Sequence, residues 1–524
     1  VYLILATVCG CANRHPDPVP GVSVSASVAE PTMAPVPTGT PTTAPTTNPT
    51  DTPTGSPTEN PTAAPSVSQQ PTAAPTETPT TEPSGRPTAA PTENPTISPT
   101  ATPNPYEEFN GKWIWASENT KNQWVRLRGT VTLNGYCRQA TAKIAVDSRY
   151  WLYVNGELVV FEGGLKRGPT PDEGYYDEVD LTEYLLPGEN TVAVLAWFWG
   201  KRGDSYSNVT TGKGAFYFDL VADGETVLTS DARWKVKEAA AYLDDSVKSE
   251  VDFDSPQANY RIPAYNVWYD AMKETDFSWE QPGFDDSRWE AATVLGVYGD
   301  APWNALQKRP VPPTKFSGIT AYRNSEILAQ DDPTKDRVLL MKIGTNIQFT
   351  PYLKVKSDTE GKKIFVTTEN TDSMEAVRFT YVADASGEQE FESFGWMNGQ
   401  YVMYAVPAGV EVVDVGYRAS GYNTEKAGDF VSDNADFARL WQMCYDTLYV
   451  TMRDNFMDCP DRERAQWWGD ATSEMEQILY SMDENSYLLY EKGLQQMFGW
   501  IITGTGTDRD DALSTVNPIS NAYF

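Results

Sequence analysis

The sequence predicts a multidomain protein with two β domains, a β-sandwich and a second β-sandwich, followed by the start of an all-helical barrel or bundle. Three observations predict this organisation. Proline recurs at every fourth residue over most of 41–103, short apolar runs bounded by turn residues follow Tyr106, and apolar residues take helical spacing after Ser432. A chain of 524 residues is long enough to contain several domains.

The charge and the histidine content exclude several classes of function. The chain has 72 acidic and 41 basic residues, so its net charge of −31 repels nucleic acid and anionic lipid. Its single histidine is His15, before the folded part. We therefore expect no Ser-His-Asp or Cys-His nucleophile, no metal and no cofactor. Carboxylates are left as the proton carriers of any chemistry.

Residues 1–11 indicate the end of an export signal. The apolar run 1–8 is too short to span a bilayer, and Val8-Cys9-Gly10-Cys11 resembles a bacterial lipobox. Cys11 is the expected lipidation site because the small Gly10 precedes it. An ordinary signal peptide with incidental cysteines is the alternative. We expect an extracellular protein on a bacterial surface that contacts the membrane only through its lipid anchor.

Residues 12–105 form a Pro/Thr-rich stalk that is expected to be disordered. Of the 38 prolines in the chain, 23 lie in residues 1–105, and no aromatic residue occurs between Tyr2 and Tyr106. Proline at this density removes backbone donors, and the segment has nothing apolar to bury. An anchored stalk of this length is suited to hold a domain away from the cell surface.

Residues 106–310 and 311–430 are predicted to be β domains. In the first, Asn155-Gly156 between two apolar runs is a strong hairpin signal, and the many short strands indicate a β-sandwich. In the second, 364–368 is a candidate strand, and 401–406 and 410–415 are predicted to pair as a hairpin around a Pro-Ala-Gly turn. We expect most of the aromatic side chains to be core residues.

Residues 431–524 are predicted to be helical, with Ser432 or Asp433 as the first cap. Three apolar stripes at helical spacing begin at Phe437, Ala471 and Tyr487. Three helices with short connections suit only the beginning of a helical barrel, because their apolar faces would stay uncovered. We therefore expect the chain to be truncated at both ends.

The connection between the first two helices concentrates the groups that glycoside cleavage needs. Residues 458–470 contain four carboxylates, two guanidiniums from Arg462 and Arg464, and two indoles. A protonated carboxylic acid must donate to the leaving oxygen, and other carboxylates bind sugar hydroxyls. Asp458 and Asp470 would raise the pKa of Glu463, and the two arginines would lower it, so the sign depends on geometry. A surface ion-pair cluster, with Asp470 as a helix cap, is the alternative.

These residues resemble the motif of glycoside hydrolase family 78, the α-L-rhamnosidases, which runs approximately Asp-Cys-Pro-x-Arg-Glu-Arg-x-x-Trp-x-Gly-Asp. The matching positions are Asp458, Cys459, Pro460, Arg462, Glu463, Arg464, Trp467, Gly469 and Asp470. Residues 147–156, 176–181 and 284–289 resemble a galactose-binding-like jelly roll. The resemblance covers about 106–490 and implies a jelly roll, a further β domain and an (α/α)6 barrel, of which 431–524 would be the beginning.

The resemblance assigns roles to individual residues. Glu463 would be the general acid, Asp458 and Asp470 would bind sugar hydroxyls with help from Arg462, and Trp467 would wall the pocket. The reaction would be hydrolysis with inversion, with water activated by a glutamate that lies later than Phe524 in the family's order. The partner would be a glycan or glycoside with terminal rhamnose. Nothing in the sequence indicates an oligomeric state.

Two alternatives remain open at this stage. Trp468 stands where the family usually has threonine, and a second indole beside the pocket would favour another sugar in the same helical barrel. The other alternative is a surface protein that binds carbohydrate through its β-sandwich without cleaving it.

Overall fold

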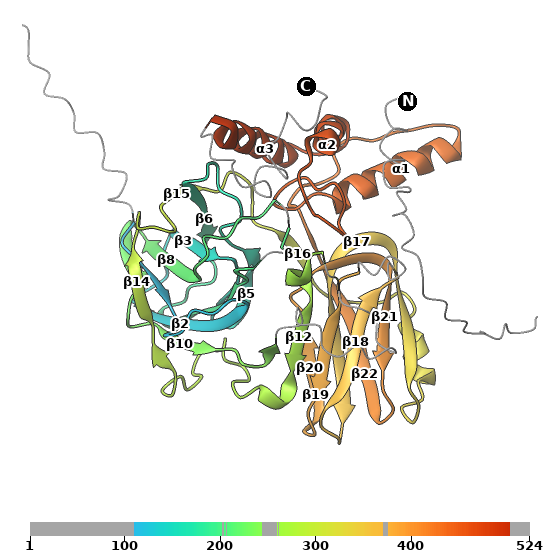
Figure 1. The fold of residues 1–524 in the computed structure, drawn as a ribbon, viewed down its shortest axis with the longest axis horizontal. Coiled ribbons are helices and arrows are strands. Elements are labelled where there is room, and N and C mark those ends of the chain that lie inside the picture. Colours follow the sequence, from blue (N-terminus) through green and yellow to red (C-terminus); the bar gives the residue numbers. More distant parts are fainter. Residues whose placement is uncertain are drawn as a thin grey trace, which may run out of the picture. The chain divides into compact units, whose positions relative to one another are not determined.

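Strands fill the described chain up to residue 421, and three helices follow (Figure 1). The computed structural model describes residues 109–201, 204–205, 207–243, 259, 261–369 and 376–502, all of which belong to one compact unit. The expected lipidation site Cys11, the stalk over 12–105 and residues 503–524 lie outside the described residues.

The first β region forms two sheets that enclose an apolar core. The seven-stranded sheet has the order β14-β1-β8-β3-β6-β15, with β9 paired to β8. Its strands are β1 Lys112–Trp115, β3 Ala140–Asp147, β6 Glu173–Asp180, β8 Ala215–Ala222, β9 Glu225–Thr229, β14 Thr293–Val297 and β15 Ala305–Lys308. The six-stranded sheet has the order β13-β10-β2-β7-β4-β5. Its strands are β2 Gln123–Leu133, β4 Arg149–Val154, β5 Glu157–Gly163, β7 Gly188–Phe198, β10 Lys235–Glu238 and β13 Glu290–Ala291.

The core of this sandwich comes from alternate residues of both sheets, as the pleat of a strand requires. Ile144 on β3 and Leu127 on β2 are fully buried in one apolar cluster with Val194 on β7. The predicted hairpin is confirmed: Val154 pairs with Glu157 across the two-residue turn. Asn155 and Gly156 both have positive φ, 52° and 85°, as a type I′ turn demands.

The strands of the second β region are joined in one nine-stranded hydrogen-bonded sheet. Its order is β11-β12-β19-β18-β21-β17-β22-β16, with β20 paired to β17. The strands are β11 Tyr242–Leu243, β12 Val267–Asp270, β16 Lys315–Ala321, β17 Arg337–Ser357, β18 Lys362–Thr368, β19 Phe379–Ala383, β20 Gly387–Glu392, β21 Met397–Val406 and β22 Val410–Gly421. The 21-residue β17 is long enough to pair with β21 over its first part and with β20 and β22 over its last part.

Two features of this sheet differ from expectation. Strands β11 and β12 come from residues 106–310, yet they pair in this sheet, β12 running parallel to β19. The predicted hairpin of β21 and β22 is wrong, because β17 lies between them and pairs with both. Arg337, at the start of β17, donates hydrogen bonds to the carbonyl oxygens of Pro407 and Val410. These bonds hold the turn across the end of the intervening strand.

Aromatic side chains join the outer face of the six-stranded sheet to the nine-stranded sheet. Trp124 stacks on Tyr242 with ring centroids 4.2 Å apart, and Trp151 lies 4.7 Å from Phe394. These rings belong to one buried cluster that continues into β17 through Phe349. The aromatic residues that follow Tyr106 therefore supply much of the packing between the two β domains, as expected of core residues.

The three predicted helices are present as α1 Ala435–Val450, α2 Trp468–Ser481 and α3 Asn485–Ile502. They pack on one another around Leu448, Met475 and Leu489. Asn434 caps α1, since its Oδ1 accepts a hydrogen bond from the backbone N–H of Asp436 at 2.9 Å. The prediction of Ser432 or Asp433 as this cap is wrong by one or two residues. Over the described part of the chain, no helix is long and apolar enough to cross a membrane.

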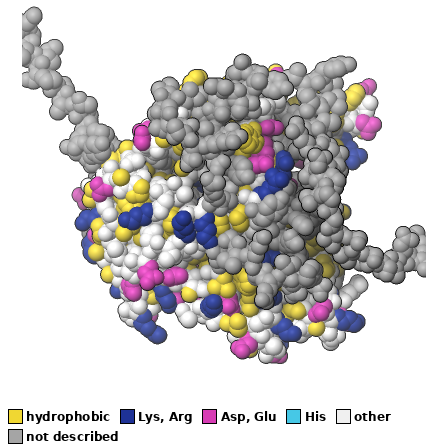
Figure 2. All heavy atoms as spheres, viewed as in Figure 1, with side chains coloured by type: hydrophobic (Ala, Val, Ile, Leu, Met, Phe, Trp, Pro, Cys, Tyr) yellow, Lys and Arg dark blue, Asp and Glu magenta, His cyan; other side chains and the backbone are white. Residues whose placement is uncertain are grey.

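Acidic and basic side chains are mixed on the described surface. Figure 2 shows lysines and arginines scattered among aspartates, glutamates and apolar side chains on one face. The excess negative charge of the chain is therefore not gathered there in a single patch.

Replacing Gly156 tests the first sandwich. A Gly156→Ala methyl group would lie 2.3 Å from Gln281 Oε1 at a φ of +85°, so we expect a loss of about 1–2 kcal/mol or more in the free energy of unfolding, measured with urea. Gly135→Ala is the matched control, because it has open space and no positive φ. Equal effects of the two substitutions would contradict the turn.

Candidate active site

The motif over residues 458–470 lies where α1 and α2 are connected. This connection closes on itself, because the backbone N–H of Asp458 donates to the carbonyl oxygen of Ala465 at 2.8 Å. The backbone N–H of Ala465 donates in return to Asp458 Oδ1 at 3.0 Å. Arg464 has a φ of +51°, a left-handed conformation that turns the chain back. The result is a tight loop, here called the acidic loop, residues 458–467.

Two serines of the first sandwich hold the acidic loop from one side. Ser205 Oγ donates to the carbonyl oxygen of Arg464 at 2.6 Å, and the backbone N–H of Gln466 donates to Ser207 Oγ at 2.8 Å. Both serines are buried. Their hydroxyls satisfy loop backbone groups that neither a helix nor a sheet would satisfy.

Arg464 fixes the loop from beneath. Its guanidinium lies over the rings of Trp396, 3.2 Å from the centroid, and Tyr265, 4.0 Å from the centroid. Its Nε also donates to the carbonyl oxygen of Pro460 at 2.7 Å. Burial lowers its pKa to about 10. Arg464 is therefore a structural cation within the loop, because its guanidinium contacts aromatic rings and a backbone carbonyl group.

A segment of the first β region holds the acidic loop from another side. The buried Asn259 donates from Nδ2 to the carbonyl oxygen of Asp461 at 3.0 Å. Arg261 Nη1 lies 3.1 Å from Glu463 Oε1. The sequence analysis expected Arg462 and Arg464 to be the cations near Glu463. In the structure these cations are Arg462 and Arg261.

Two carboxyl groups and a thiol meet inside the loop. Cys459 Sγ lies 3.1 Å from Asp458 Oδ2 and 3.6 Å from Glu463 Oε2. Arg462 Nη2 lies 3.7 Å from Glu463 Oε2 and 4.0 Å from Asp458 Oδ2. The side chain of Asp458 is 8% exposed and that of Glu463 is 16% exposed, so both are largely removed from water.

The surroundings shift the pKa values of the two carboxyl groups in opposite directions. Burial, followed by the hydrogen bond with Glu463, raises the pKa of Asp458 to about 7. Burial alone would raise the pKa of Glu463 too, but the hydrogen bond from Asp458 and the charges of Arg462 and Arg261 outweigh it and lower that pKa. In this arrangement the proton resides on Asp458, whereas the family resemblance implies that Glu463 carries it.

Of the other predicted site residues, Arg462 and Asp470 interact with this pair. Arg462 is 37% exposed, Trp467 is half-buried directly before α2, and Asp470 is exposed in the first turn of α2. Trp468 is different: it is buried in the apolar core of the three helices. The expectation of a second indole beside the pocket is therefore wrong.

The chemistry of this cluster does not suit a metal ion. Ligand atoms of Asp458, Cys459 and Glu463 lie within 4.8 Å of one another. A bound cation would require the thiolate form, yet burial and the neighbouring Asp458 raise the pKa of Cys459 to about 12. Two guanidiniums already lie beside the carboxylates. We assign the cluster to proton chemistry.

Sequence reasoning missed a third carboxyl group near the loop. Glu474 lies one helical turn after Asp470 on α2 and is buried. Burial raises its pKa well above the ordinary value, and the charges of Asp470 and Asp458 add to the rise. The i, i+4 spacing from Asp470 was the available signal, but nothing in the sequence showed that this face of α2 is covered.

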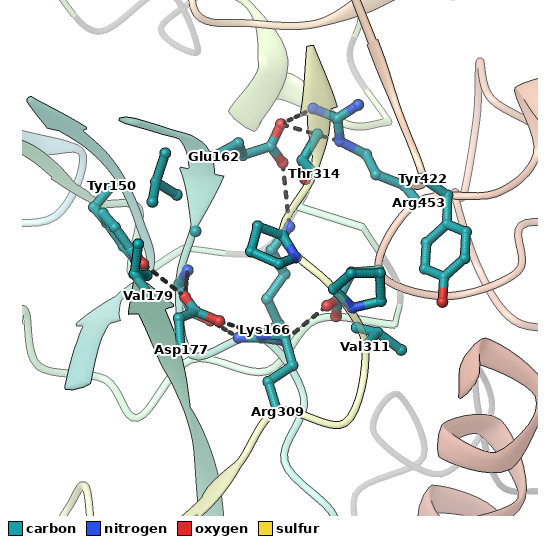
Figure 3. A pocket seen from close by; sticks show the side chains of 16 residues that line it. Tyr150, Glu162, Lys166, Asp177, Val179, Arg309, Val311, Thr314, Tyr422 and Arg453 are labelled. Carbon is teal, nitrogen blue, oxygen red and sulfur yellow. Dashed lines mark hydrogen bonds and ion pairs between the residues drawn. The ribbon is translucent and has the colours of Figure 1, made fainter. Parts of the chain in front are cut away.

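A small recess lies between β5, the linker after β15 and the connection that follows α1 (Figure 3). Glu162 lies there with Arg453, with Lys166 at 3.2 Å and with Arg149 at 3.5 Å. Burial alone would raise the pKa of Glu162, but the three cations lower it to about 2.

A second ion-pair chain crosses the same recess. Arg309 bridges Asp177 of β6, at 2.5 Å, and Asp454, at 2.7 Å. Lys492 of α3 lies 2.8 Å from Asp454. Because the charged groups that line the recess are paired with one another, we interpret it as a polar joint between the sandwich and the helices.

The comparisons with known proteins agree with this arrangement. Residues 425–501 match the family model of the bacterial α-L-rhamnosidase six-hairpin glycosidase domain. The chain is 26% identical over 210 residues to an α-L-rhamnosidase of Streptomyces avermitilis, covering 37% of this chain and 15% of that protein. It is 22% identical over 409 residues to an α-L-rhamnosidase of Formosa agariphila, covering 71% of this chain and 39% of that protein.

Solved structures show the same fold. A family 78 rhamnosidase of Bacillus sp. GL1 superposes with a TM-score of 0.60 at 17% identity, covering 72% of this chain and 62% of that chain. The Streptomyces avermitilis α-L-rhamnosidase complexed with L-rhamnose superposes with a TM-score of 0.55 at 18% identity, covering 74% of this chain and 37% of that chain. The shared fold has β domains before a helical domain.

The chain is therefore similar to α-L-rhamnosidases of glycoside hydrolase family 78, through the domain match at 425–501 and through its fold. It spans 15% and 39% of the length of the two curated relatives that it matches.

The polar joint gives a pH-dependent prediction. Since the pKa of Glu162 falls from 4.5 to about 2 on folding, its stabilisation is fully present above about pH 4.5 and is lost as the pH falls toward 2. Glu162→Gln should cost roughly 3 kcal/mol of unfolding free energy at pH 7 and about half of that at pH 3.

Urea unfolding at the two pH values measures this difference. Glu157→Gln is the control, because Glu157 is exposed at the start of the same strand. A cost for Glu162→Gln that does not change with pH would contradict the assignment of an ionised, buried Glu162.

Proposed function

We propose that this protein is an exported glycosidase that removes terminal α-L-rhamnosyl, or closely related, residues from glycans with inversion. The observation that carries the proposal is the pair Asp458 and Glu463, which lies within the segment that matches the α-L-rhamnosidase glycosidase domain. The lipobox-like Cys11 and the Pro/Thr-rich stalk support attachment to a bacterial surface.

The carboxyl pair supplies the proton for bond cleavage. Glu463 is the general acid, and it protonates the glycosidic oxygen as the bond to the anomeric carbon breaks. Asp458 serves as the store of that proton near neutral pH, because its pKa is about 7 and it is hydrogen-bonded to Glu463. One shared proton thus passes from Asp458 through Glu463 to the leaving group.

The residues around the pair suit a sugar ring. Asp470 and Arg462 hydrogen-bond hydroxyl groups together with Asp458, and the half-buried Trp467 offers an apolar wall. Inversion requires a second carboxylate about 6.5–9.5 Å from the acid to activate water. In the family order this base follows the part of the barrel that contains α1, α2 and α3.

The sugar itself follows from the relatives and the loop. The burial of Trp468 removes the feature that favoured a different sugar, because this indole lines the helical core. The (α/α)6 completion of the helical domain is part of the proposal and is supported by the match of 425–501 to the six-hairpin model.

Glu463→Gln in the full-length gene product tests the role of the acid. Hydrolysis of rhamnosides with poor leaving groups should fall by on the order of 10²–10⁴-fold, because no acid remains to protonate the leaving oxygen. Hydrolysis of 4-nitrophenyl α-L-rhamnoside should fall much less. Initial rates on both substrates make the comparison.

Glu388→Gln is the matched control, since Glu388 is 53% exposed on β20. Equal losses on both substrates would remove Glu463 from the role of acid. A wild-type protein that releases no sugar from rhamnosides, related deoxysugar glycosides or uronides would overturn the function.

A further inference from the structure

The cation closest to Glu463 comes from outside the helical domain. After β10 the chain leaves the first sandwich, contributes β11 and β12 to the nine-stranded sheet, and returns as β13. Arg261 lies on this excursion, more than 200 residues before Glu463. Its Nη1 is 3.1 Å from Glu463 Oε1, while Arg462 of the acidic loop itself is 3.7 Å from the other oxygen.

A built hydrogen-bond array places Arg261. Asn259 is 1% exposed, and its Oδ1 accepts from the backbone N–H groups of Arg261 and Ile262, both at 2.9 Å. Its Nδ2 donates to the carbonyl oxygen of Asp461, two residues before Glu463, at 3.0 Å. Asn266 holds Asn259 in turn, donating to its carbonyl oxygen at 2.8 Å. The buried side-chain amide of Asn259 therefore fixes the position of Arg261 relative to the acidic loop.

The charges that face Glu463 come from three elements. The acidic loop contributes Asp458, Cys459 and Arg462, and α2 contributes Asp470. The excursion contributes Arg261. Asp458 and Asp470 oppose ionisation of Glu463, and the two arginines favour it. Arg462 is also within 4.0 Å of Asp458, so its charge is divided between the two carboxyl groups.

We propose that Arg261 is a positioning residue that orients the Glu463 carboxyl group and sets the pH at which this group takes up its proton. Through Arg261, a non-catalytic β segment would determine the alkaline limit of hydrolysis. This inference rests on the proposed role of Glu463 as the acid.

Arg261→Gln removes the charge and leaves a shorter, neutral amide donor. The alkaline limb of the pH profile for kcat/KM on a rhamnoside with a poor leaving group, whose cleavage needs the acid, should move up by about 1 pH unit, because loss of a cation at this range makes protonation of Glu463 easier. Arg261→Lys should restore most of the original profile. Arg233→Gln is the matched control, since Arg233 is 80% exposed on the first sandwich and should leave the profile unchanged.

A second measurement needs no turnover. In the full 524-residue chain with ¹³C-labelled glutamate carboxyl groups, the signal that disappears in Glu463→Gln reports the titration of Glu463. Its midpoint should rise by about 1 pH unit in Arg261→Gln and stay near the wild-type value in Arg261→Lys.

The two measurements separate the two proposals. A midpoint that moves in the 524-residue chain, together with a full-length gene product that releases no sugar from rhamnosides, would overturn the proposed function and keep the role of Arg261. A midpoint within 0.2 pH units of wild type in well-folded Arg261→Gln, on the order of the error of such a titration, would overturn the role of Arg261. If Arg261→Gln fails to fold, Arg261→Ala and Arg261→Lys take its place. A Glu463 midpoint that is unchanged in Arg261→Ala, or lowered in Arg261→Lys, would also overturn the role of Arg261.

Discussion

The shape of the acidic loop depends on hydrogen bonds and stacking that the two β domains supply. Residues 458–467 lie in neither a helix nor a sheet, so their backbone groups need partners from elsewhere. Ser205 and Ser207 bond the loop on one side, Asn259 bonds it on another, and the Arg464 guanidinium stacks on Trp396 beneath it. The β domains thus have a direct part in the geometry of the site, even though the family motif lies wholly in the helical domain.

The same packing determines where the charge resides. Burial and the neighbouring Glu463 raise the pKa of Asp458, while the hydrogen bond with Asp458 and the charges of two arginines outweigh burial and lower the pKa of Glu463. The arginines beside Glu463 favour the proton on Asp458 in the described arrangement. An acid supplied from a neighbouring carboxyl group remains available near neutral pH, where an isolated glutamate would already be ionised.

Much of the architecture was predictable because its signals are local. The Asn155-Gly156 turn and the apolar stripes of α1, α2 and α3 follow from adjacent residues, and the motif located the acidic loop. The pairing of β12 with β19 and the insertion of β17 between β21 and β22 depend on contacts between distant residues, which no local pattern reveals. For the same reason Arg261 was missed.

The proposed function requires that a sugar binds against the acidic loop with its anomeric carbon beside Glu463. A crystal structure of the full-length gene product with L-rhamnose bound would test this requirement. We expect a ring that stacks on Trp467, with hydroxyl groups bonded to Asp458 and Asp470 and with O1 within hydrogen-bond reach of Glu463. Rhamnose bound at another site, with the Glu463 carboxyl group still closed off by Arg261 and Arg462, would contradict it.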